Sequence, residues 1–126
     1  MSATPDNLFV VDKDCEKVSE VASLAFRTVV AKTLYVTKRV RLDTSIAVAF
    51  LTTRVRAPNT DAWEKLCHLM EYLRGDRDCP LILIGENDGV LMWYIDAAFA
   101  IHPNMCRHTG GGLTMGRGFP IAVSTK

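Results

Sequence analysis

The sequence contains no C-x-x-C pair, and its four cysteines are widely separated. They are Cys15, Cys67, Cys79 and Cys106. Structural zinc sites use closely spaced ligands, and disulfide frameworks belong to small secreted domains. The spacing therefore argues against both, and we expect four free thiols.

The sequence also lacks a long hydrophobic run. No apolar stretch approaches the roughly 18 to 20 residues that a membrane-spanning helix requires. Residues 1–9 lack the basic start and apolar centre of a signal peptide. These absences predict a cytosolic or nuclear protein that does not enter a membrane.

The net charge is only +1 at pH 7, but the charges are unevenly distributed. Residues 27–56 hold seven Lys or Arg and a single acid, Asp43. Five of these basic residues are candidates for contacts with nucleic-acid phosphates. They are Lys38, Arg39, Arg41, Arg54 and Arg56. An ordinary solvated surface explains the same cluster equally well, so both interpretations stay open.

The composition changes near residues 75–80, and the part before this break has helical patterns. Apolar residues at three- and four-residue steps, with polar caps, predict three helices. The first helix spans residues 18–36. The second begins at a cap, Asp43 or Thr44, and ends at Pro58. The third begins at a cap, Asn59 or Thr60, and ends at Gly75. The apolar side of the second helix is expected to consist of Ile46, Ala47, Phe50 and Leu51. The apolar side of the third is expected to consist of Trp63, Leu66, Cys67, Met70 and Leu73.

After the break, apolar runs alternate with glycines. Residues 80–84 and 90–100 predict two strands that form a hairpin around a turn at 85–89, and residues 119–123 predict another strand. We therefore predict an α+β fold in two parts. A helical segment covers residues 1–78, and a three-stranded antiparallel sheet covers residues 79–126.

Asp96 is a single carboxylate within the apolar strand Val90–Ala100. Burying an unpaired charge is costly, so such an acid usually has a partner. Asp96 could face solvent at the edge of the sheet or accept hydrogen bonds from a neighbouring turn. It could also be a metal ligand, because carboxylates bind the cations used in phosphate chemistry.

The strand that carries Asp96 belongs to an ordered series of motifs. It has the sequence WYIDAAFAIHPNM over Trp93–Met105, followed by HTGG over His108–Gly111. Four further segments lie upstream: Phe26–Val36, Arg41–Asp43, Ala47–Leu51 and Tyr72–Gly75. In this order the segments resemble the polyprotein of copia-type LTR retrotransposons, where reverse transcriptase joins ribonuclease H. That family typically has W-x-V-D-A-S-Y-A-V-H and then H-T-G-G at the start of the nuclease.

The resemblance implies the identity of both parts of the chain. Residues 1–78 would be the thumb and connection end of a reverse transcriptase, and residues 79–126 the N-terminal strands of an incomplete ribonuclease H-like domain. The parent polyprotein would copy RNA into DNA and use Mg²⁺ to cleave RNA in RNA:DNA hybrids. Asp96 would then be the first acid of a two-magnesium site. The implied partners are an RNA:DNA hybrid or template-primer duplex and other element proteins, with no small-molecule substrate for the fragment.

Several catalytic features of the family have no counterpart in this sequence. No Asp-Asp pair is present for polymerisation, and the sequence ends at Lys126 before the next acid of the nuclease. The matched blocks also depart from the usual residues at Leu42, Ala98, Phe99 and Asn104. We therefore expect the fragment to be inactive and not to bind Mg²⁺ stably.

A second hypothesis is a non-catalytic nucleic-acid-binding module retained from a retroelement. The basic middle region would supply the main contacts. Arg107 and His108, beside the glycines, are weaker candidates for phosphate contact. His102, Cys106 and His108 superficially suggest a zinc site, but no fourth ligand is nearby. No motif for another cofactor is present.

Overall fold

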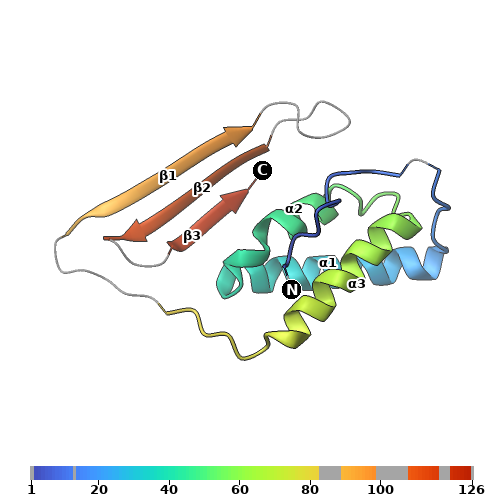
Figure 1. Cartoon of the computed structure of the whole chain (residues 1–126), viewed down its shortest axis with the longest axis horizontal. Helices are drawn as coiled ribbons and strands as arrows, with labels where there is room; N and C mark the ends of the chain where they lie inside the picture. The colour runs from blue at the N-terminus through green and yellow to red at the C-terminus, as the bar shows by residue number, and fades with distance from the viewer. Residues whose placement is uncertain (1, 13, 83–88, 99–107, 117–119, 126) are drawn as a thin grey trace.

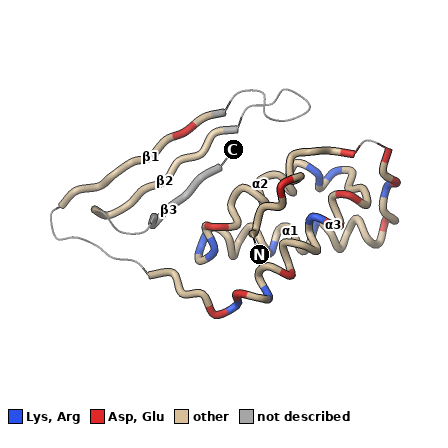
Figure 2. Tube along the Cα trace, in the orientation of Figure 1, with Lys and Arg blue, Asp and Glu red and all other residues tan. Residues whose placement is uncertain are grey.

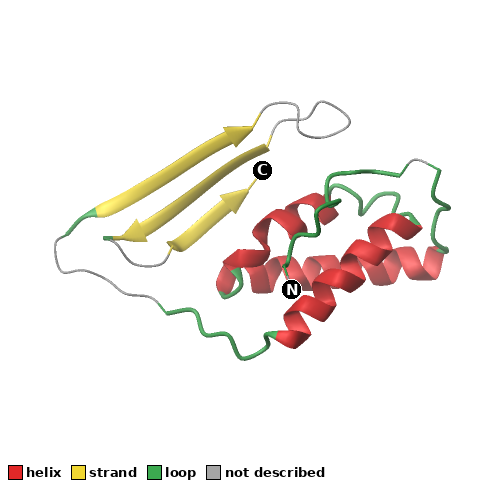
Figure 3. Cartoon of the chain, viewed as in Figure 1, coloured by secondary structure: helices red, strands yellow, loops and turns green. Residues whose placement is uncertain are grey.

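The computed structural model describes residues 2–12, 14–82, 89–98, 108–116 and 120–125. Over these residues the fold is mixed α+β, as predicted, with helices first and strands last (Figure 1 and Figure 3). The helical elements are α1 (Glu20–Arg39), the 3-10 helix η1 (Leu42–Thr44), α2 (Ser45–Thr52) and α3 (Thr60–Gly75). The strands are β1 (Leu91–Ala98), β2 (His108–Met115) and β3 (Pro120–Thr125). None of the helices in these ranges is both long and apolar enough to cross a membrane.

Polar side chains begin α1 and α3. The Ser19 hydroxyl accepts a hydrogen bond from the N–H of Ala22 at 3.3 Å, and the Asn59 side chain accepts one from the N–H of Ala62 at 2.9 Å. Each cap satisfies a backbone donor that the first turn of a helix leaves unpaired. Local sequence therefore determines where both helices start.

The second helix is shorter than predicted. It ends at Thr52, and the following residues form turns before Pro58. The hydroxyls of Thr52 and Thr53 donate to the carbonyls of Ala49 and Phe50, both at 2.7 Å. Threonine side chains that bond to the preceding turn compete with continued helical hydrogen bonding.

The helical part has its own apolar core, to which the segment before α1 contributes. Its buried residues are Ala3, Leu8, Phe26, Val30, Ala47, Val48, Phe50, Leu51, Ala62, Leu66 and Leu69. The ring of Phe9 meets that of Phe50 edge-on, with centroids 5.8 Å apart. His68 Nε2 lies 2.9 Å from the carbonyl oxygen of Ser2, and Lys65 Nζ donates to the carbonyl of Val10. Residues 2–10 are therefore held against α3 and α2.

The buried faces of α2 and α3 differ from the predicted ones. Cys67 is exposed, whereas Lys65 is only 5% exposed. Ile46 is 46% exposed, and Val48 is buried instead. Lys65 can occupy the core because Asp61 neutralises its ammonium group at 2.8 Å. A charged residue at a buried position is not visible to a pattern that counts apolar residues.

The strands form an antiparallel meander in the order β1-β2-β3. The register places Trp93 opposite Leu113 and Asp96 opposite Gly110. The pairing with β3 is irregular between Leu113 and Thr114. Gly116 follows β2 with a φ of 68°, in the left-handed region that glycine adopts without strain.

The predicted hairpin between residues 80–84 and 90–100 is wrong where the structure describes these residues. Residues 80–82 form no strand, and Ile82 is 60% exposed. Strand β1 pairs with β2 instead. Residues 83 and 84 lie outside the described residues. An apolar run is a strand only if it finds a partner, and sequence periodicity does not identify that partner.

The sheet meets the helices through one edge. Strand β3 lies against α1 and α2, and β1 forms the opposite edge (Figure 1). The apolar side chains of β1 are 38–77% exposed on both faces: Leu91, Met92, Trp93, Tyr94 and Ile95. A strand that buries neither face gains little hydrophobic stabilisation. The division of the chain at residues 78 and 79 stays a prediction.

Candidate functional site

Asp96 lies near the end of β1, with its side chain exposed. Its Oδ1 atom accepts a hydrogen bond from the N–H of Ala97 at 2.8 Å. Gly110 is its partner on β2, and open space surrounds the position that a Gly110 side chain would occupy. The carboxylate therefore lies beside bare glycine backbone.

An open hollow of about 520 Å³ adjoins this carboxylate. Its lining residues are Trp93, Tyr94, Ile95, Asp96, Gly110, Gly111 and Gly112. The hollow exists because the three glycines of β2 have no side chains to fill the space beside the large residues of β1. Its lining residues are one acid, three larger apolar or aromatic residues of β1 and three glycines of β2.

The described residues do not fit the pair of magnesium ions that the resemblance implies. No group of three or more His, Cys, Asp or Glu side chains converges in the part of the chain that the structure describes. Mg²⁺ requires near-octahedral oxygen coordination, and a two-metal site needs several carboxylates around both ions. Asp96 supplies one carboxylate, and Glu86 and Asp88 lie outside the described residues.

Arg41 does not belong to the basic surface that the sequence suggested. The residue is only 6% exposed. Its Nε and Nη2 atoms donate to the carboxylate of Asp43 at 3.0 and 2.8 Å, and Nη1 donates to the carbonyl of Asp76 at 2.6 Å. The guanidinium lies 5.3 Å from the centre of the Tyr72 ring. Because these donors are already used, Arg41 fastens the loop after α1 to the end of α3 and does not reach out to a phosphate.

The contacts around Arg41 shift three pKa values. The pKa of Asp43 is lowered, chiefly because Arg41 donates hydrogen bonds to its carboxylate. The pKa of Arg41 is raised, chiefly by the same hydrogen bonds to Asp43. The pKa of Tyr72 is raised, chiefly because its hydroxyl donates to Asp43 at 2.7 Å. The three shifts favour the protonation states in which these side chains bond to one another: charged Arg41, ionised Asp43 and protonated Tyr72. This is expected for a structural cluster.

Basic residues lie at several separate places along the helical part of the chain (Figure 2). The remaining basic candidates form two pairs in the sequence. They are Lys38 with Arg39, and Arg54 with Arg56. Lys38 and Arg39 form the last turn of α1. Arg56 follows α2 and lies next to Arg27, which is on α1. The Arg27 side chain donates hydrogen bonds to the carbonyls of Val55 and Arg56 at 2.8 and 3.4 Å. A helical rise of about 1.5 Å per residue puts Arg27 about 18 Å from Arg39 along α1. The structure therefore does not unite the predicted cluster.

The exposed members of the two pairs are available for contacts with an anion. Lys38, Arg39 and Arg56 are exposed, and no acidic side chain of the described residues forms an ion pair with them. Arg39 lies over the ring of Tyr35 at 5.3 Å. Arg54 is half-buried, with its guanidinium 5.2 Å from the centre of the Phe50 ring. Arg107 and the side chain of His108 lie outside the described residues.

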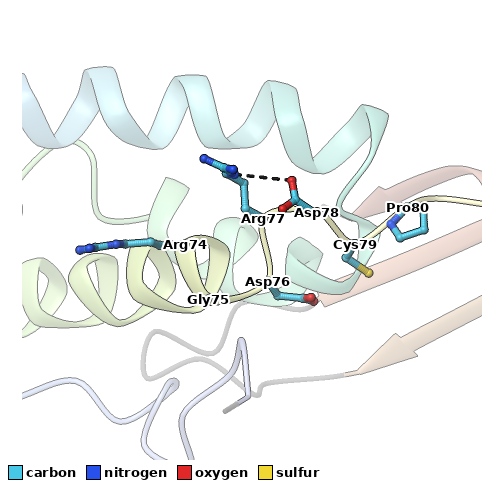
Figure 4. Close-up of a pocket in the computed structure, with 7 residues that line it drawn as sticks. All are labelled: Arg74, Gly75, Asp76, Arg77, Asp78, Cys79 and Pro80. Carbon is cyan, nitrogen blue, oxygen red and sulfur yellow. Dashed lines mark ion pairs between the residues drawn. The ribbon is translucent and has the colours of Figure 1, made fainter.

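A second open hollow, of about 550 Å³, follows the end of α3 (Figure 4). Its lining residues are Arg74, Gly75, Asp76, Arg77, Asp78, Cys79 and Pro80. Arg77 and Asp78 form an exposed ion pair at 3.5 Å. Two arginines and two aspartates balance one another here, so the hollow has no net charge to attract an anion or a cation.

Sequence reasoning missed two charged clusters that hold the helices together. The Asp61–Lys65 pair had a local signal, because residues four apart lie on the same side of a helix. The contact between Arg41 and Asp76 had no signal in the local sequence, because 35 residues separate the two residues.

Comparisons with known proteins identify no relative. The chain matches no protein-family model, and neither a curated protein nor a solved structure matches it. A functional interpretation therefore depends on the ordered sequence motifs and on the geometry of the sites described above.

Proposed function

We propose that the chain is a segment of a copia-type retrotransposon polyprotein, from the junction of reverse transcriptase and ribonuclease H. The ordered motifs from Phe26 to Gly111 support this proposal. The sequence of helices followed by an antiparallel meander, with Asp96 in its first strand, is compatible with it. The parent protein would act on RNA:DNA hybrids in the cytoplasm or nucleus.

The segment itself does not cleave RNA under this proposal. The main support is that Asp96 is the only acid lining its hollow, and no group of three possible metal ligands converges among the described residues. Cleavage by two metal ions depends on carboxylates that hold both ions at the scissile phosphate. Asp96 marks the ancestry of the strand and does not constitute an active site.

The purified 126-residue chain is expected to release no product from an end-labelled RNA:DNA hybrid in Mg²⁺ above the buffer background. The Asp96→Asn variant should be indistinguishable from the parent, because one carboxylate cannot position two ions. Gel analysis of the RNA strand measures this, with a complete ribonuclease H as the positive control. Mg²⁺-dependent cleavage that disappears in Asp96→Asn but persists in Arg77→Ala would contradict the proposal.

A second candidate function is nucleic-acid binding without chemistry. The observation in its favour is the exposed basic pair at the end of α1, Lys38 and Arg39, which has no acidic partner among the described residues. The same pair also complements the negative end of the helix dipole. Binding is therefore a separate hypothesis with its own test.

If the pair contacts phosphates, a Lys38→Ala/Arg39→Ala variant will bind an RNA:DNA hybrid more weakly at low salt. Two lost phosphate contacts should reduce the slope of log affinity against log salt by about 2. Fluorescence anisotropy over a salt series measures the slope. Arg74→Ala/Arg77→Ala is the matched control, since it removes the same charge from a neutralised region. Equal slopes in both variants, or no binding at low salt, would rule out this interface.

A further inference from the structure

Residues 2–12 form a strap before α1, and side chains hold it by donating hydrogen bonds to its backbone carbonyls. The donors are Asn59, Lys65 and His68, and their acceptors are the carbonyls of Asp12, Val10 and Ser2, respectively. Lys65 and His68 are on α3, and Asn59 is its N-cap. Every residue has a backbone carbonyl, so these hydrogen bonds recognise the course of the main chain and not particular side chains.

Apolar anchors of the strap supply the side-chain recognition. Ala3 and Leu8 are 6% and 2% exposed, and both belong to the apolar core. Phe9 adds the edge-on contact with the ring of Phe50 on α2. The strap therefore combines main-chain acceptors with a few apolar anchors, which is how many bound peptides are recognised.

The strap also has internal structure of its own. The N–H of Leu8 donates to the carbonyl of Pro5 at 2.9 Å, and the N–H of Val10 donates to that of Asn7 at 3.0 Å. These two hydrogen bonds close successive turns and involve no residue of the helices. A detached strap can therefore form the same turns.

The chain between the strap and α1 is fixed independently of the strap. The N–H of Val18 donates to the carbonyl of Pro58 at 3.3 Å, and the N–H of Thr60 donates to that of Glu16 at 3.0 Å. Apart from the two strap anchors, the buried core residues that the structure describes belong to α1, α2 and α3. Detachment of the strap therefore leaves this connection and a helical core in place.

We propose that the strap is detachable and that its binding surface takes the strap of a second copy of the chain. This surface, the strap site, consists of Phe50, Asn59, Lys65 and His68. Each copy carries both a strap and a strap site, so an exchanged strap makes the same contacts as the original, and reciprocal exchange closes a dimer. The strap of the same chain competes at a high effective concentration, so the monomer predominates until that strap is loosened.

The chemistry of the strap site favours this occupant over a nucleic acid. The ammonium group of Lys65 is already paired with Asp61 at 2.8 Å, and the Lys65 side chain is only 4% exposed. It therefore offers little to a phosphate. The other members of the site are an aromatic ring, an imidazole and an amide, which suit a main chain with apolar side chains. The strap has this character, and it lies across α2 and α3 (Figure 1).

Peptide binding to the full chain tests the strap site. A fluorescein-labelled peptide with the sequence of residues 1–12 should bind the Leu8→Asp variant at least about ten-fold more tightly than the unmodified chain, whose own strap occupies the site. Leu8→Asp loosens that strap because a charge replaces a buried anchor. Asn7→Asp is the matched control, since it adds the same charge at the exposed neighbouring residue. Fluorescence anisotropy measures the affinities, and a peptide that carries Leu8→Asp should bind none of the three proteins.

Mixing two variants of the full chain tests the second copy as the partner. Leu8→Asp keeps an intact strap site, whereas Lys65→Met/His68→Ala keeps an intact strap and loses two donors of its site. Sedimentation should detect a dimer in the mixture at concentrations where each variant alone is monomeric. Adding Leu8→Asp to the second variant removes the remaining intact strap and should abolish the dimer.

Chemical acetylation of Lys65, located by mass spectrometry, measures opening of the strap without any partner. Relative to the exposed Lys38, Lys65 should react at least about ten-fold faster in Leu8→Asp than in Asn7→Asp, and the peptide should restore its protection. Circular dichroism reports whether Leu8→Asp keeps its helices.

Loss of the helical signal in Leu8→Asp would show that the strap is an integral part of the core, and this would overturn the proposal. So would a folded Leu8→Asp chain that binds no peptide, equal binding of the two peptides, or a mixture that stays monomeric. Unchanged acetylation of Lys65 would also contradict it. These outcomes do not depend on the proposed ancestry of the chain.

Discussion

Replacing Phe26 by alanine is expected to lower the free energy of unfolding by about 3–5 kcal/mol. Phe26 is fully buried in α1, and its ring centre lies 6.3 Å from that of Trp63 on α3. The substitution removes the transfer free energy of the ring and leaves a cavity between the two helices. Since small domains have only about 5–15 kcal/mol of stability, much of the population could unfold.

Urea unfolding followed by far-ultraviolet circular dichroism measures this loss through the helical signal. Val21→Ala is the matched control, because Val21 lies on the same helix and is 81% exposed. It should change stability by less than about 0.5 kcal/mol. Similar losses in the two variants would mean that the Phe26 ring does not lie in a packed core.

Removing the charge of Asp61 is the second change with a large expected effect. Asp61→Asn should destabilise the chain by about 3 kcal/mol, because the buried ammonium group of Lys65 then lacks its counter-ion. The side chains of Lys65 and Asp61 are only 4% and 17% exposed, and their charged atoms are 2.8 Å apart. The remaining partners of Lys65 are the carbonyl of Val10 and the Phe50 ring, which do not neutralise it.

The reverse substitution distinguishes a lost charge pair from lost packing. Lys65→Met keeps most of the apolar volume and leaves Asp61, the more accessible partner, so its cost should be smaller. The double variant Asp61→Asn/Lys65→Met should recover most of the stability lost in Asp61→Asn. Additive losses in this double-mutant cycle would show that the pair is not coupled. Chemical unfolding of all four proteins supplies the comparison.

Features encoded by neighbouring residues were predictable from the sequence. Asn59 caps α3 as expected, since its partner Ala62 is only three residues away. The α+β class and the start of α1 likewise follow from local patterns of apolar and polar residues. These elements depend on contacts within one or two turns of the same helix.

Features that depend on distant residues were not predictable. Residues 80–82 have the apolar character of a strand, but β1 pairs with β2, which follows it in the chain. Arg41 appeared to belong to a basic surface because its sequence neighbours are basic. Its distant partners are Tyr72 on α3 and Asp76 just after that helix, and no local pattern reveals them. The same limit explains why two pairs of basic residues were predicted as one cluster.

The position of residues 2–10 against α3 has a consequence for synthesis of the chain. Val10 receives its hydrogen bond from Lys65, which the ribosome adds 55 residues later. Residues 2–10, which include Leu8 and Phe9, must therefore wait for several seconds, at about 5–20 residues per second, before Lys65 of α3 exists to hold them. During this interval an apolar segment is open to chaperones and to premature association, and slowing translation between residues 10 and 65 would prolong it.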